Sequence, residues 1–419
     1  MRDVLVTFVV FVLLPVAIVR PYVGVYLYSW LSYMNPHKLG WGFATEMPFA
    51  ALAAAATLIG IVISRDIRLP RPSVIVVLWL LWVLWMTVSN WFAIYPDLAG
   101  EEWKRTMKIQ LMIAATVLLI YNRQKLDGLI WIVFISVGFY GIKGGIFTIL
   151  TGGQYIVWGP PGGFFAGNNS LALALLMVIP LGFYLYSQQT NKPVRMAIVG
   201  SIALSVLAVL ASYSRGAFLG AVATFGVLAL RSRFSILAIP ATVVLLLGAF
   251  LFMPDDWRQR IDSIQNYKED GSAMGRINAW HFAVNLANDR PLVGGGFQTF
   301  EPKLFYKYAP NPTDFHDAHS IYFEVLAEHG YVGLILFLLL GLSTYREGGK
   351  ITRLCRDREE LKWAENLSRM IQLSLVPYAV SGAFLGLAYF DLYYLLIAMT
   401  VILGNHVREQ IRMPGENYP

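Results

Sequence analysis

Long apolar runs alternate with short polar segments along most of the chain. Many of these runs reach the roughly 20 residues that a helix needs to cross a hydrocarbon core, whereas barrel strands would alternate over about ten residues. The pattern predicts an all-α polytopic membrane protein with about twelve transmembrane helices. The runs cover 3–35 (with breaks at Pro15 and Pro21), 47–64, 73–94, 106–121, 127–150, 168–187, 195–213, 216–230, 234–253, 325–345, 369–389 and 391–407.

The polar segment 254–318 is far longer than any other connection between the runs. A segment of this length is typically structured or functional. Within it, Arg276 to Asn288 has apolar residues at helical spacing, and Asp289-Arg290-Pro291 ends that helix. The following Gly294-Gly295-Gly296 permits close approach of another backbone. We therefore expect helices 1–9 in 1–253, a helical loop subdomain in 254–318, and helices 10–12 with a tail in 319–419.

Basic residues collect in alternate loops, as they do on the cytoplasmic side of membrane proteins. With the N-terminus taken as inside, the charge pattern alternates through all twelve crossings, which predicts that both termini are cytoplasmic and that 254–318 is periplasmic in a Gram-negative host. The run Val4–Val19 has no small-x-small cleavage site after it, so we expect a retained helix. The predicted inner segments hold Arg65, Arg68, Arg71, Arg123, Lys125, Lys192, Arg195, Arg231, Arg233, the basic run from Arg346 to Arg369, Arg408 and Arg412.

Composition supports the membrane class, because 57% of the residues are hydrophobic and only 14% are charged, against about a quarter charged in soluble domains. The net charge of +7 comes largely from the loop residues above and does not indicate a nucleic-acid partner. The single cysteine, Cys355, excludes an internal disulfide and a multi-cysteine metal site.

The end of the long polar segment sets an imidazole, His319, two residues after a carboxylate, Asp317. A neutral imidazole is the commonest general base near pH 7, and Asp317 is close enough to orient it or to raise its basicity. His316 and His329 are competitors, although the Ala-Glu-His-Gly sequence around His329 is typical of a helix C-terminus. Asp314, His316, Asp317 and His319 crowd together, but their spacing matches no standard zinc pattern, so no metal is expected.

Three cationic residues stand near the predicted outer membrane surface. Arg215 interrupts two apolar runs, and its planar donors suit a phosphate; the alternative is that it reaches lipid headgroups. Arg276 follows Gly275 at the start of the predicted helix, where free N–H groups favour anions; an ordinary solvated arginine is the alternative. Lys143 lies within an apolar run and could pair with phosphate or reach the membrane surface.

Two arginines and one imidazole on the outer side suit glycosyl transfer from a lipid diphosphate. The diphosphate leaves as an anion and needs cationic stabilisation, while the acceptor hydroxyl needs a base. Such chemistry requires no metal and no cofactor.

Four motifs resemble the O-antigen ligase and polymerase superfamily. They are Ser214-Arg-Gly-Ala, Gly275-Arg-Ile-Asn-Ala-Trp, Pro291-Leu-Val-Gly-Gly-Gly-Phe, and the segment from Ala318 to Leu334. Ser320 stands where that family often has Asn. The N-terminal Arg20-Pro-Tyr-Val-Gly and Ser32-Tyr-Met-Asn-Pro-His further resemble a subgroup of O-glycosylation ligases associated with exosortase loci.

This resemblance implies a GT-C-like glycosyltransferase of the bacterial inner membrane with a periplasmic active site. It would move a preassembled O-antigen glycan from undecaprenyl diphosphate to lipid A–core oligosaccharide without a metal. Arg215 and Arg276 would hold the diphosphate, and His319 would activate the acceptor hydroxyl. The alternatives are an O-antigen polymerase, a protein O-oligosaccharyltransferase, or a transporter of the lipid-linked glycan with Arg215 and Lys143 along its path.

Overall fold

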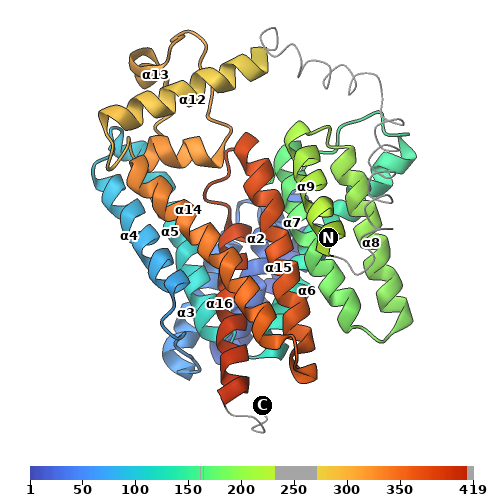
Figure 1. The fold of residues 1–419 in the computed structure, drawn as a ribbon. Helices are drawn as coiled ribbons and strands as arrows, with labels where there is room; N and C mark the ends of the chain where they lie inside the picture. Colours follow the sequence, from blue (N-terminus) through green and yellow to red (C-terminus); the bar gives the residue numbers. More distant parts are fainter. Residues whose placement is uncertain (161, 164, 232–270, 413–419) are drawn as a thin grey trace.

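The computed structural model describes residues 1–160, 162–163, 165–231 and 271–412, which form a helical bundle (Figure 1). These described residues contain fourteen α-helices, four short 3-10 helices and no strand, so the all-α prediction is confirmed. The α-helices are α1 (Arg2–Val19), α2 (Pro21–Tyr33), α3 (Phe49–Ser64), α4 (Val74–Trp91), α5 (Pro96–Leu119), α6 (Arg123–Leu150), α7 (Asn168–Gln188), α8 (Lys192–Leu210), α9 (Arg215–Arg231), α12 (Gly271–Asp289), α13 (Pro302–Tyr308), α14 (Ile321–Cys355), α15 (Lys362–Ser381) and α16 (Asp391–Arg412).

Six of the described helices, α1, α4, α6, α7, α8 and α14, are long and apolar enough to cross a membrane by themselves. Two more, α3 and α9, are apolar but shorter. The chain is therefore a multi-pass membrane protein, while the number of twelve crossings stays a prediction. The predicted run 234–253 lies outside the described residues, as does the start of the loop segment 254–318.

The first apolar run is a helical hairpin in which α1 alone is long and apolar enough to cross a membrane by itself, so the single crossing predicted there stays a prediction. The chain turns at Arg20, because Pro21 disfavours a helical conformation of the residue before it. Val10 of α1 packs in one cluster with Leu27 of α2, and the Asp3 carboxylate accepts a hydrogen bond from the Gly42 N–H at 3.1 Å. The beginning of α1 therefore lies beside the segment that follows α2.

The first residues of α1 and the last residues of α16 lie toward opposite ends of the bundle, and the prediction that both termini are cytoplasmic stays a prediction. Ser32, near the end of α2, donates a hydrogen bond to Asp391 at the start of α16. At the other end of α16, Glu409 contacts Arg71, which precedes α4. We call the end with Ser32 and Asp391 the α12 end, because α12 lies across it, and the other the C-terminal end (Figure 1).

The predicted helix of the long polar segment is confirmed as α12. Phe282 and Leu286 on its buried face pack against α13 and against Ala327 of α14. Figure 1 shows α12 lying across one end of the bundle with α13 beside it. That this subdomain is periplasmic stays a prediction.

The glycine run Gly294–Gly296 packs closely against the backbone of α14, as expected, at a point where that helix is broken. Gly330 has φ 67° and ψ −171°, a conformation that side chains disfavour. At this break the N–H groups of Gly295 and Gly296 donate to the carbonyls of Ala327 and Glu328 at 2.8 and 2.9 Å. The glycine run therefore stabilises an interruption of α14 at Gly330, about two and a half helical turns after its first residue, Ile321. It also confirms that His329 ends a helical segment.

Candidate active site

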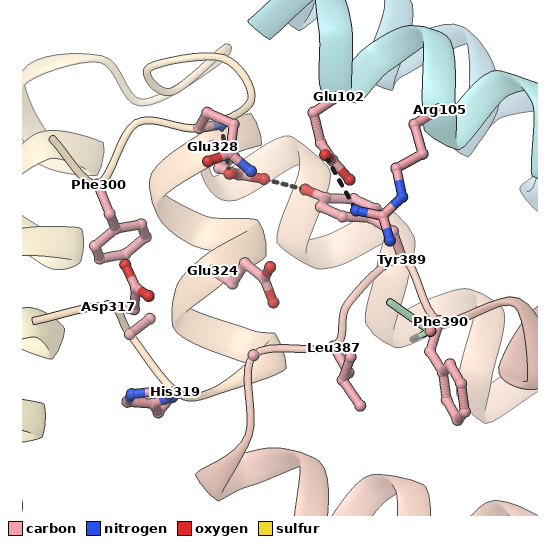
Figure 2. A pocket seen from close by; sticks show the side chains of 14 residues that line it. Glu102, Arg105, Phe300, Asp317, His319, Glu324, Glu328, Leu387, Tyr389 and Phe390 are labelled. Atoms are coloured by element: carbon pink, nitrogen blue, oxygen red, sulfur yellow. Dashed lines mark hydrogen bonds and ion pairs between the residues drawn. The ribbon is translucent and has the colours of Figure 1, made fainter. Parts of the chain in front are cut away.

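A cavity of about 340 Å³ opens at the α12 end of the bundle (Figure 2). Its walls come from α5, the start of α14, the connection between α15 and α16, and three loop segments. The lining residues are Glu102, Arg105, Gly163, Gln298, Phe300, Asp317, Ala318, His319, Glu324, Glu328, Gly386, Leu387, Tyr389 and Phe390. Charged, aromatic and backbone groups therefore face the same space.

Helix α12 holds the loop that carries His319. The indole of Trp280 donates to the Ala318 carbonyl at 2.8 Å. The amide of Asn278 donates to the Asn311 and Asp314 carbonyls at 2.8 and 3.0 Å. These contacts hold both ends of the segment that leads to the imidazole.

The backbone of His319 lies in the left-handed region, with φ 42°. Only a small fraction of residues other than glycine adopt this region, and Asn, Asp and His do so most often. The turn directs the chain from the loop into α14, whose N-cap is Ser320. The His319 side chain is exposed on the cavity wall, where a bound molecule can reach it.

The pKa of His319 is lowered from its ordinary value. Partial loss of hydration is the largest cause, and the positive charge of Arg276 is the second. Asp317 opposes this shift, whereas His316 adds to it. The imidazole is therefore mainly neutral at pH 7, which is the form that accepts a proton. Asp317 does raise the pKa of His319, as expected, but burial and the charge of Arg276 outweigh it, so the pKa is lowered overall.

Carboxylates dominate the rest of the cavity wall. One oxygen of Glu324 accepts a hydrogen bond from the Ala388 N–H at 3.0 Å, and its carboxylate points into the cavity in Figure 2. Glu102 forms an ion pair with Arg105 at 3.6 Å. Glu328 accepts from the Gln298 N–H at 2.7 Å and from the Tyr389 hydroxyl. Glu328 is thus satisfied by protein groups, whereas Glu324 keeps one oxygen with no partner among the described residues.

His329 belongs to the supporting structure and does not line the cavity. Its ring is fully buried, with Nε2 2.7 Å from the Tyr389 hydroxyl and Nδ1 2.6 Å from the Ser89 hydroxyl. These contacts join α4, α14 and the α15–α16 connection behind the cavity. His329 is therefore a weaker candidate for the base than His319.

The sequence-predicted residues are only partly gathered at this cavity. Asp317 and His319 line it, and Arg276 lies close enough to affect the His319 pKa. Arg215 begins α9 at the same end of the bundle but does not line the cavity. Its neighbour Gly216 packs against Phe384, in the connection that leads to the cavity wall. Arg215 is thus separated from His319 by this short connection.

Lys143 is exposed on α6 and does not line the cavity. The glycine face of α6 packs on α8, with Gly141 against Ser205 and Gly145 against Leu204. Lys143 lies between Gly141 and Gly145 in the sequence, but its side chain is exposed on the surface of α6. We therefore leave it out of the proposed donor site.

Residues 200–338 match the O-antigen ligase family. Residues 1–190 match a second family, whose function is unknown. No curated protein matches the sequence. The subgroup that the N-terminal motifs suggest stays a prediction.

The O-antigen ligase match contains Arg215, Arg276, Asp317 and His319, together with Glu324 and Glu328 of the cavity. Other parts of the wall lie outside that match. Glu102 and Arg105 come from the region of unknown function, and Tyr389 lies beyond both matches. The cavity is thus assembled from three parts of the chain.

Sequence reasoning missed four charged residues of the cavity. Glu324 and Glu328 could have been predicted from the sequence, because two acidic residues four positions apart share one face at the start of an apolar helix. Glu102 and Arg105 could not have been predicted in this way, because they lie just before an apolar run and resemble ordinary charged residues at a membrane surface.

Proposed function

We propose that this protein is a lipid-diphosphate-dependent oligosaccharide transferase, an O-antigen ligase that joins a preassembled glycan to lipid A–core oligosaccharide. The observation that carries the proposal is the His319 imidazole on a cavity wall. Arg276 lies nearby, and the pKa of His319 is lowered. The match of residues 200–338 supports a lipid-linked glycan as the substrate.

In the proposed reaction, neutral His319 accepts the proton of an acceptor hydroxyl. The oxygen of that hydroxyl forms a bond to the anomeric carbon of the donor glycan. The bond from this carbon to the diphosphate oxygen breaks, and undecaprenyl diphosphate leaves with the electron pair. Arg276 and Arg215 stabilise the negative charge of the leaving group. The proton on His319 later passes to solvent, so the base is regenerated.

The charges of the cavity suggest how the two substrates divide the space. Four carboxylic side chains and a single arginine line it, so the cavity itself offers a diphosphate few positive charges. We therefore assign the diphosphate to the side of Arg276 and Arg215. The free oxygen of Glu324 suits a hydroxyl of the acceptor sugar, and the partly exposed Phe300 offers an aromatic face to it.

Loop charge supports an outward-facing site. Arg71, Arg123, Lys125 and Arg408 lie at the C-terminal end of the bundle, where Arg123 and Lys125 begin α6. The positive-inside rule assigns this end to the cytoplasm. The cavity then faces the periplasm of an inner membrane, the C-terminus is cytoplasmic, and the N-terminus, being at the α12 end, is periplasmic.

Reconstitution tests this function. The purified full-length protein is mixed with an undecaprenyl-diphosphate glycan and lipid A–core, and the products are separated by gel and mass spectrometry. The expected product is lipid A–core that carries the whole glycan. Longer lipid-linked chains would instead identify a polymerase, and glycosylated protein an O-oligosaccharyltransferase. Movement of the donor across vesicles with no new glycosidic bond would overturn the proposal in favour of a transporter.

A further inference from the structure

A second cavity, of about 530 Å³, lies at the C-terminal end of the bundle, away from the proposed active site. The start of α4, the last third of α14 and the end of α16 surround it. Its lining includes five basic residues and a single carboxylate. These are Arg71, Arg346, Lys350, Arg408, Arg412 and Glu347. We call it the basic pocket.

The carboxylate does not balance the positive charge. Glu347 contacts both Arg408 and Lys350, the latter at 3.7 Å. Among the described residues, the one ion pair of Arg71 is with Glu409, at 3.9 Å, and its buried Nη1 has no hydrogen-bond partner there. A buried guanidinium nitrogen without a partner costs free energy, so this arrangement indicates an anion that supplies the missing acceptor.

Helix α4 adds a second attraction for an anion. Ser73 caps its N-terminus, and both Val74 and Ile75 line the basic pocket. The first N–H groups of a helix have no partner within the helix, and its dipole favours negative charge there. Guanidinium groups and helix N–H groups together are the donors that bind phosphate.

The surroundings distinguish a lipid phosphate from a free one. Both α4 and α14 are candidate membrane spans, and the basic pocket lies where α4 begins. From this point an apolar stripe runs along the outside of α4, with Val74, Val77 and Leu80 being 67%, 51% and 54% exposed. An acyl chain can follow this stripe while its headgroup occupies the pocket.

We propose that the basic pocket binds the phosphate headgroup of an anionic phospholipid. Basic pockets between membrane helices on the cytoplasmic side are suited to such headgroups. The bound phosphate would contact Arg71 and Arg346 and would tie the start of α4 to α14. This site is independent of the proposed glycosyl transfer, because it lies at the opposite end of the bundle.

Native mass spectrometry of the full-length protein in detergent tests the proposal, with phosphatidylglycerol and phosphatidylcholine as probes. We expect phosphatidylglycerol to bind more tightly. A basic residue near a membrane contributes about fivefold to the binding of an anionic lipid. Arg346→Gln should therefore weaken phosphatidylglycerol binding about fivefold, and Arg71→Gln with Arg346→Gln about 25-fold.

Arg353→Gln is the matched control, because Arg353 is exposed on the same helix as Arg346 and does not line the basic pocket. This variant should bind phosphatidylglycerol as the wild type does. Arg346 is itself exposed, so its substitution should leave the fold intact, and the unfolding temperature without lipid checks this.

Three results would overturn the proposal. An equal loss of binding in the Arg353 variant would mean that general surface charge attracts the lipid. Equal binding of both lipids would mean that no headgroup site exists. Competition by millimolar inorganic phosphate at constant ionic strength separates the two phosphate sources: full displacement of phosphatidylglycerol would identify a free-phosphate site and refute the lipid assignment.

Discussion

Replacing His319 by Asn and, separately, by Ala separates its chemistry from its backbone role. The left-handed conformation at φ 42° is tolerated by Asn but costs roughly 1 kcal/mol for most other residues. Neither side chain can act as the base. A positioned general base typically contributes about 10²- to 10⁴-fold to the rate, which is about 3–5 kcal/mol of transition-state stabilisation.

We therefore expect both variants to lose activity by about 10²- to 10⁴-fold, while only the Ala variant loses about 1 kcal/mol of stability. The assay is single-turnover transfer with the donor already bound and the acceptor in excess. Donor affinity, measured separately, should stay within about twofold of the wild type, because His319 acts on the acceptor. If the Asn variant keeps more than about a tenth of the wild-type rate, His319 is not the base.

Three further predictions follow from the cavity and its support. Arg276→Gln removes a cation that lowers the His319 pKa, so the acid limb of the pH–rate profile should move to higher pH; Asp317→Asn should move it to lower pH. Glu324→Gln should lower kcat/KM for the acceptor by about 2- to 10-fold, the range for a hydrogen bond between neutral groups, with donor affinity unchanged. Gly294→Ala should reduce the unfolding free energy by at least about 2 kcal/mol, because φ is 61° and the new Cβ would lie 2.5 Å from the Ala327 carbonyl.

The Glu324 and Gly294 variants each have a matched control in α5. Glu101 is an exposed carboxylate next to Glu102 that does not line the cavity, so Glu101→Gln should leave acceptor kinetics unchanged. Gly100 has open space at its Cβ, so Gly100→Ala should be neutral or slightly stabilising. A shift of both acid limbs in the same direction would contradict the charge assignment at His319. Equal destabilisation by the two glycine substitutions would contradict the packing argument at the α14 break.

Local patterns in the sequence were sufficient for several features of this protein. The length of the apolar runs predicted a helical membrane protein, because whether a segment is stable in lipid depends mainly on its own residues. Helical spacing after Arg276 predicted α12, and the run from Gly294 to Gly296 predicted a close backbone approach. The pair of Asp317 and His319 was visible because the two residues are neighbours in the chain.

Only the tertiary structure decided which distant segments meet. The Pro21 break was visible, but a proline does not specify the angle between two helices, so neither the α1–α2 hairpin nor the opposite termini could be predicted. Glu102 and Tyr389 are far apart in sequence yet line one cavity. Lys143 was an equally plausible site residue by type, but the packing of α6 leaves it exposed. Residue type and spacing determine what a segment can do, whereas long-range packing determines which side chains share a site.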